Sequence, residues 1–220
     1  MFTSILRLIF RLTIIGTLCL SGLVVCINFP FVTEMISRNT SITTIYSCDL
    51  DSMVKIALAG RDFALGTIGR EGLASVISTC GLNPSLLDEE MLTHLQDCTA
   101  IFSGVNLAFI ILLVGSLISI LITGLVDDLE SVGKLIMQSG LLALVVMIVI
   151  AFSAVVNFDM FFNNMHTLLF NGGVWKFDAN SLLICMYPEN FWISMGSVCA
   201  IVSIVLSIAA TIFGFFVKKI

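Results

Sequence analysis

The fold is decided by an unbroken run of uncharged and largely apolar residues, AIFSGVNLAFIILLVGSLISILITGL, from Ala100 to Leu125. A helix rises about 1.5 Å per residue, so a run of this length can cross a hydrocarbon core of roughly 30 Å. Three further segments of the same character lie at residues 12–31, 135–157 and 192–216. The sequence therefore predicts an all-α membrane protein with four transmembrane helices.

The composition supports this fold class. Hydrophobic residues make up 58% of the 220 residues and charged residues only 11%, which is outside the usual range of soluble domains. The formal net charge is −5, so the chain offers no basic surface for nucleic acid. We expect a single membrane domain over residues 1–220, with membrane lipid as a partner and no nucleic-acid partner.

The few basic residues predict the orientation of the spans. Arginines at positions 7 and 11 precede the first span, Lys134 lies between the second and third, and lysines at positions 218 and 219 follow the fourth. Basic residues near span ends favour the cytoplasmic side, so both termini are predicted to be cytoplasmic. The first span has a longer apolar run than a signal peptide and no A-x-A-like cleavage site, and we interpret it as an uncleaved anchor.

Two loops then face outward, at residues 33–98 and 158–191. In the first, Asp49 or Asp51 can cap a short helix, and several glycines follow. We expect a small cap of irregular structure that could include a short strand pair. Near the end of this loop, Asp88 is a good N-cap for a helix that runs unbroken into the second span.

The seven cysteines divide between the spans and the outer loops. Cys48, Cys80, Cys98 and Cys185 face outward, and four cysteines allow three disulfide connectivities, which the sequence leaves open. The chain contains no C-x-x-C pair, which argues against a membrane enzyme that oxidises thiols.

Two histidines, His94 and His166, are scarce enough to be considered individually. His94 lies 31 residues before Leu125, and His166 lies 32 residues after Lys134. If the helix of the third span continues through FDMFFNNMH, the two side chains reach similar heights, at the outer membrane surface. This placement predicts a shared site.

Histidine can take or give a proton near neutral pH, and a neighbouring carboxylate can orient it. Asp97, three residues after His94, lies on the same helical face, and Asp159 and Asp178 are candidate partners of His166. The alternative is that the histidines are solvated interfacial side chains, the aspartates are surface charges and Trp175 belongs to an interfacial aromatic belt.

Other kinds of site are poorly supported. The sequence lacks an H-E-x-x-H motif and closely spaced histidine or cysteine ligands, so no metal or cofactor is expected. A G-x-S-x-G motif for a serine hydrolase is also missing. If the chain is an enzyme, its nucleophile comes from the substrate.

Two stretches carry a family resemblance: EEMLTHLQDC from Glu89 to Cys98 and FDMFFNNMHTLLFNGGVWKFDANSLLICMYPENFW from Phe158 to Trp192. They resemble the bacterial lipoprotein intramolecular transacylases in an H-x-x-D element, a histidine after the third span, a W-x-F-D element and a proline-aromatic ending. The chain departs from the family pattern at Met165, where phenylalanine is usual, and at Ala179, where proline is usual. Cys98 also stands where a small aliphatic residue is usual.

The resemblance implies an acyltransferase of the bacterial cell membrane. Its substrate would be a diacylglyceryl lipoprotein, whose sn-2 acyl chain moves to the α-amine of the N-terminal cysteine and leaves a lyso-form lipoprotein. The implied catalytic residues are His94 and His166, supported by Asp97, Asp159, Trp175 and Asp178, at the outer leaflet surface of a monomer. The alternative is a non-catalytic four-span scaffold or lipid-binding membrane protein.

Overall fold

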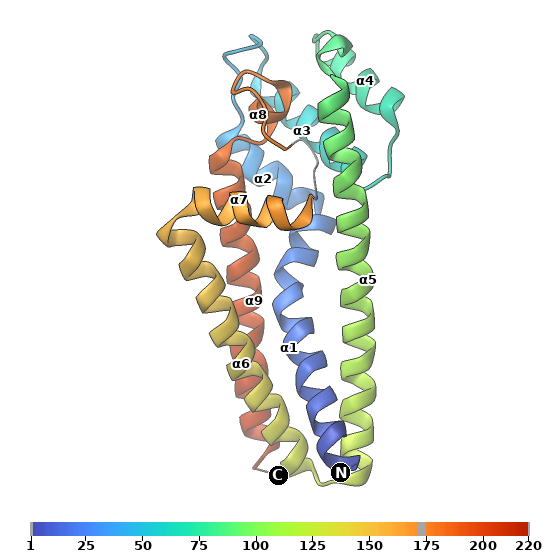
Figure 1. Ribbon diagram of the computed structural model, residues 1–220, viewed down its shortest axis with the longest axis vertical. Helices are drawn as coiled ribbons and strands as arrows, with labels where there is room; N and C mark the ends of the chain where they lie inside the picture. The colour runs from blue at the N-terminus through green and yellow to red at the C-terminus, as the bar shows by residue number, and fades with distance from the viewer. Residues whose placement is uncertain (1, 171–174, 220) are drawn as a thin grey trace. The chain divides into compact units, whose positions relative to one another are not determined.

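The computed structural model describes residues 2–170 and 175–219 (Figure 1). Within these ranges the chain is helical and contains no strand, which confirms the predicted all-α class. Four of the described helices are long and apolar enough to cross a membrane: Ser4–Asn28, Glu89–Val126, Leu129–Val156 and Glu189–Val217.

The chain divides into two compact units. The first consists of Met1–Val25, Val105–Val156 and Ser197–Ile220, and the second of Cys26–Gly104 and Asn157–Gly196. Both histidines belong to the second unit.

The first unit is built from parts of the four long helices α1 (Phe2–Asn28), α5 (Glu89–Val126), α6 (Leu129–Val156) and α9 (Glu189–Val217), which Figure 1 draws as long coiled ribbons. All four contribute to one core. The buried side chains of this core are Phe10, Ile14, Val132, Leu135 and Ile136, and Leu18, Ile120 and Ala210 pack against them. Outward-facing leucines, isoleucines and valines on the same helices are exposed, as expected for surfaces that meet lipid.

Glycines let α9 approach α1 and α6 closely in this unit. A Cβ atom at Gly22 would overlap the carbonyl oxygen of Cys199, and one at Gly140 would lie 2.8 Å from the backbone nitrogen of Thr211. The Gly22 amide also donates a hydrogen bond of 3.0 Å to the hydroxyl of Ser203. Close backbone approach at small residues is typical of helix packing in membranes.

The second unit contains a helical cap. Its first part comprises α2 (Pro30–Thr40), α3 (Leu50–Ala64), α4 (Arg70–Thr79) and the short 3-10 helix η1 (Pro84–Leu86). The expected helix start at Asp49 is confirmed, because its carboxylate accepts a hydrogen bond of 2.9 Å from the Ser52 amide. The expectation of a strand pair is wrong. Apolar residues recur at helical rather than strand spacing, and Met53, Ile56 and Ala57 on one face of α3 are fully buried.

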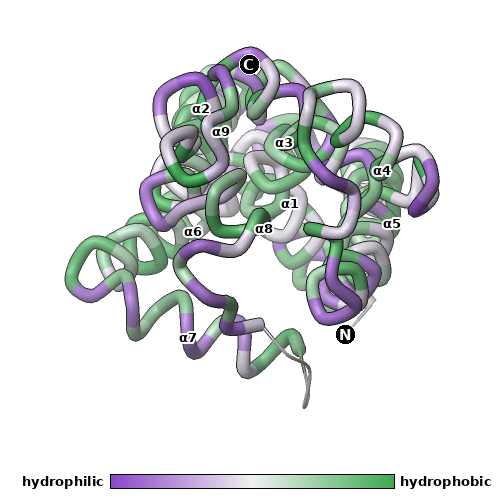
Figure 2. Tube along the Cα trace, turned by 90° about the horizontal axis from the view of Figure 1, so that it is seen from above, coloured by the Kyte–Doolittle hydropathy of each residue, from purple (hydrophilic) through white to green (hydrophobic). Residues whose placement is uncertain are grey.

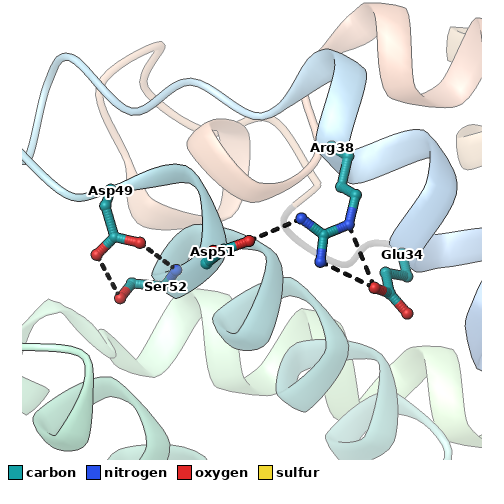
Figure 3. A network of polar contacts seen from close by, with 5 residues as sticks. All are labelled: Glu34, Arg38, Asp49, Asp51 and Ser52. Carbon is teal, nitrogen blue, oxygen red and sulfur yellow. Dashed lines mark hydrogen bonds and ion pairs between the residues drawn. The ribbon is translucent and has the colours of Figure 1, made fainter.

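An exposed charge network joins α2 to α3 (Figure 3). The Arg38 guanidinium contacts Asp51 at 2.7 Å and Glu34 at 3.0 Å. Because these side chains are largely solvated, the network adds little to the stability of the cap.

The segment after α6 departs from the expected continuous helix. α6 ends at Val156, and α7 (Phe158–Leu169) begins after Asn157, whose backbone is extended (φ −156°, ψ 93°). The Asn157 side chain accepts a hydrogen bond of 2.8 Å from the Met160 amide and so caps a new helix. Figure 2 shows hydrophilic and hydrophobic residues mixed along α7. The short helix α8 (Leu182–Met186) follows.

Candidate active site

His94 lies near the start of α5, in the cap unit. The Asp88 carboxylate accepts a hydrogen bond of 2.7 Å from the Met91 amide, so the predicted helix start is confirmed. His94 is 8% exposed and lies among the buried side chains of Met91 and Leu95. One turn later, Cys98 places its Sγ 4.0 Å from His94 Nε2.

His166 lies in the last turn of α7 and is 6% exposed. Its Nδ1 is 2.9 Å from the carbonyl oxygen of Phe162. A carbonyl oxygen can only accept, so Nδ1 donates the proton and the neutral ring keeps its lone pair on Nε2. Burial lowers the pKa of His166 below its ordinary value, and the hydrogen bond to Phe162, which acts in the opposite direction, is the smaller influence. The site therefore favours a neutral imidazole.

The two imidazoles stack on each other although the continuous helix that predicted their meeting is interrupted. Their ring centroids are 6.1 Å apart and their planes differ by 19°. We call His94 and His166 the histidine pair. Two titratable rings at this spacing can serve one reacting group.

An aromatic shell surrounds the histidine pair, and it consists of Phe162, Phe170, Trp175 and Phe177. The Phe170 ring lies 4.7 Å from that of His94 and 5.3 Å from that of His166. Phe177 is 5.4 Å from His94, whereas Phe162 and Trp175 are 4.0 Å and 5.1 Å from His166. The shell makes the surroundings of both imidazoles largely apolar.

The shell is anchored within the same unit through Trp192. The Trp192 ring lies 5.9 Å from that of Phe162, and its indole N–H donates a hydrogen bond of 3.1 Å to the Tyr187 carbonyl. The Tyr187 hydroxyl in turn donates to the Ala57 carbonyl of α3, and burial raises the pKa of this phenol well above its ordinary range. These contacts tie the wall of the site to the cap.

Of the predicted supporting residues, Trp175 contacts a histidine ring, whereas the three aspartates are exposed. Trp175 is brought against His166, as given above. Asp97 is exposed on α5, and Asp159 is exposed in the first turn of α7. Asp178 is exposed too, and its carboxylate accepts a hydrogen bond of 2.8 Å from the Asn180 amide in the turn before α8. The glycine turn predicted at positions 171–173 lies outside the described residues.

Three phenylalanines of the shell were not among the predicted site residues. Phe162 and Phe170 stand four residues before and after His166, which is the spacing of neighbours on one helical face, so this signal was present in the sequence. Phe177 is brought in by the chain after α7, and no local spacing indicates it. In the part of the chain that the structure describes, no three metal-ligating side chains gather at this or another place.

Comparison with known proteins places these features in a family. The sequence profile described as lipoprotein intramolecular transacylase Lit matches residues 78–192, which is more than half of the chain and includes both histidines. The chain belongs to the lipoprotein intramolecular transacylase family. A search among curated protein sequences gave no match.

Solved structures share the fold of this transacylase. An in meso structure of the membrane integral lipoprotein intramolecular transacylase Lit from Bacillus cereus is 14% identical and superposes with a TM-score of 0.81, covering 98% of this chain and 95% of its own. A second structure of that protein, with a histidine-to-arginine mutation, is also 14% identical and has a TM-score of 0.76, covering 98% and 92%.

Family membership gives the activity. The protein is a membrane acyltransferase that acts on lipoproteins and moves an acyl chain within one lipoprotein molecule. The alternative of a non-catalytic scaffold is not favoured.

Proposed function

We propose that the histidine pair catalyses transfer of the sn-2 acyl chain of a diacylated lipoprotein to the α-amine of its N-terminal cysteine. The observation that carries this proposal is the stacking of two buried imidazoles, 6.1 Å apart, inside an aromatic shell. Both residues lie within the stretch that matches the family.

The reaction needs little from the protein besides orientation and proton transfer. The amine nitrogen attacks the ester carbonyl carbon, a C–N bond forms, and the bond from that carbon to the glyceryl oxygen breaks. The amine loses a proton and the glyceryl oxygen gains one, so the overall step is balanced without a co-reactant. Because nucleophile and ester belong to one molecule, holding them in contact supplies much of the rate enhancement.

The hydrogen bond at Nδ1 supports a base role for His166. Its Nε2 carries the lone pair, and the lowered pKa keeps the ring neutral near pH 7. In this role His166 takes the proton from the attacking amine. His94 donates a hydrogen bond to the oxygen that becomes negatively charged, and the proton that His166 took from the amine passes to the leaving glyceryl oxygen, so both imidazoles return to their starting state.

The aromatic shell has a proposed role in selectivity. An ester held next to a general base can be attacked by water instead of the amine. Packing of Phe170 and Trp175 against the imidazoles reduces the access of water, so aminolysis is favoured over hydrolysis.

Carboxylates complete the proposed site at longer range. Asp97 remains the proposed partner that orients His94, and Asp159 and Asp178 the proposed partners of His166. Asparagine substitutions test these pairings: Asp97→Asn should lower the rate through His94, and of Asp159→Asn and Asp178→Asn only the variant that removes the partner of His166 should lower it.

The orientation of the protein follows from its charges and its substrate. Basic residues before the first span and after the last favour cytoplasmic termini. The lipid-modified end of a bacterial lipoprotein lies at the outer leaflet surface, and we propose that the histidine pair acts there, in a monomer with no bound cofactor.

A bacterium that lacks lipoprotein N-acylation provides the test. The chain is expressed there together with a diacylated reporter lipoprotein, and the N-terminal lipopeptide is analysed by tandem mass spectrometry. Intramolecular transfer leaves the mass unchanged, so the fragment ions must be used to locate the acyl chain on the amine or on the glycerol. We expect the amine-linked isomer with the native chain and its loss with His94→Ala or His166→Ala.

The control is Asn164→Ala, an exposed position on the same helix as His166. It should convert the reporter like the native chain. A reporter that keeps its free amine in cells with well-inserted native protein would contradict the proposal and favour the scaffold alternative.

A further inference from the structure

A second polar feature lies in the other compact unit, on the membrane-crossing helix α1. The Arg11 side chain is partly buried, and its Nη2 donates a hydrogen bond of 2.8 Å to the side-chain oxygen of Gln138 on α6. None of the carboxylates in the described ranges lies within ion-pair distance of Arg11. The guanidinium therefore has a neutral amide as its partner and no counter-charge from the described protein residues, at the end of the first span where lipid phosphates lie.

Arg7, one turn earlier on the same helix, shows the ordinary solution. Its guanidinium pairs with Asp127 at 3.0 Å. The two arginines thus differ in their partners although they share a helix, and the difference makes Arg7 a matched control for Arg11.

Arg11 and Gln138 lie at the edge of the core of this unit. Phe10, next to Arg11, and Ile136, two residues before Gln138, are buried in that core and pack the two helices against each other. Beside them is a cavity of about 340 Å³ lined by Arg11, Gln138, Leu141 and Leu142. The two leucines are 46% and 49% exposed, so the cavity opens toward the lipid-facing surface of α6.

We propose that this cavity binds a membrane phospholipid, with the phosphate on Arg11 and Gln138 and an acyl chain along Leu141 and Leu142. The guanidinium has a planar fork of donors that matches a phosphate, and the Gln138 amide adds an N–H donor while its oxygen holds Arg11. A soluble anion would leave the leucines uncovered, and an uncharged lipid would leave the arginine unbalanced.

Native mass spectrometry of the purified, delipidated protein in detergent tests the proposal with phosphatidylglycerol as the probe and diacylglycerol as the uncharged comparison. We expect one retained phosphatidylglycerol on the native chain and on Arg7→Gln. Arg11→Gln should weaken binding by about tenfold or more, the effect of losing a charged hydrogen-bond partner. Diacylglycerol should bind weakly to all variants.

A second variant distinguishes loss of the lipid site from misfolding of Arg11→Gln. Leu142→Trp fills the cavity from the lipid-facing side and keeps Arg11, and we expect it to displace the lipid as well. Equal retention of phosphatidylglycerol by native, Arg11→Gln and Leu142→Trp proteins would overturn the proposal, as would equal binding of diacylglycerol. Inorganic phosphate that binds as tightly as the lipid would reduce the site to an anion site and would also overturn it.

Discussion

At the scale of single residues, the protonation of His166 governs the proposed reaction. Burial lowers its pKa, so the neutral base persists at pH values below the ordinary histidine pKa of about 6.5. The rate of conversion of a diacyl lipopeptide is measured in detergent as a function of pH. We expect the midpoint of the decrease in rate at acidic pH to lie below pH 6.5. A midpoint at or above that pH would contradict a buried neutral base.

Removal of the base should be costly. His166→Ala is expected to lower the first-order rate of acyl transfer by about 10²- to 10⁴-fold, the usual contribution of general acid–base catalysis. His166→Gln keeps a polar side chain of similar reach, and it should be nearly as impaired because an amide takes no proton. The rates are compared for purified proteins that have the same melting temperature. If His166→Gln keeps much of the native rate, His166 positions the substrate instead of taking a proton.

Cys98 tests whether the protein itself carries the acyl chain. Its sulfur is 4.0 Å from His94 Nε2, which resembles a cysteine–histidine nucleophile pair. In the proposed reaction the substrate amine attacks directly, so Cys98→Ala should change the rate by less than about tenfold, or 1.4 kcal/mol. Complete loss of activity, together with a thioester adduct on the native protein by mass spectrometry, would replace direct transfer with a two-step route.

The sequence allowed prediction of the two residues that are proposed to carry protons, but not of the side chains around them. His94 and His166 could be singled out because the chain has only two histidines. The hydrogen bond of His166 to Phe162 and the approach of Phe177 depend on where α7 begins and how the chain returns. Those features arise from tertiary packing, which spacing along the chain does not report.

At the scale of helices, Asn157 decides where α7 begins and therefore where His166 lies. Asn157→Ala removes the side-chain cap on the Met160 amide and is expected to cost about 1 kcal/mol of helix stability. We expect faster hydrogen exchange in the first turn of α7 and a lower acyl-transfer rate. Asn157→Asp retains a capping oxygen and should behave like the native chain, so an equal loss in both variants would argue against the cap.

Helix starts were more predictable than helix breaks. Asp49 and Asp88 each precede an apolar helical pattern, and both caps are present. Asn157 stands inside an apolar stretch, where an asparagine can be an interior residue or a cap. The end of α6 at Val156 could therefore not be predicted from the sequence. The strand pair was expected because glycines were given more weight than the helical spacing of Met53, Ile56 and Ala57.

At the scale of the whole molecule, close helix packing should control stability. A side chain at Gly22 would overlap the Cys199 carbonyl, so Gly22→Val must push α1 and α9 apart. We expect a loss of about 1–3 kcal/mol, seen as a lower melting temperature in detergent. The control is Gly104→Ala, where a Cβ meets nothing within 4 Å. Similar melting temperatures for both variants would contradict the packing account.

Hydropathy was sufficient to predict the four long helices, because each contains a charge-free stretch long enough to cross a bilayer. The division into two compact units was not predicted. It depends on contacts between segments far apart in sequence, such as those of residues 26–104 with residues 157–196.

Intramolecular transfer by the histidine pair is tested with purified protein and a diacyl lipopeptide in which only the sn-2 chain is deuterated. This lipopeptide is mixed with an equal amount of an unlabelled lipopeptide that has a different peptide sequence. Tandem mass spectrometry locates the deuterated chain after the reaction. We expect the label on the amine of its own peptide with the native protein, and no transfer with His94→Ala or His166→Ala. Label on the other peptide, or undiminished transfer by either histidine variant, would contradict intramolecular transfer by the histidine pair.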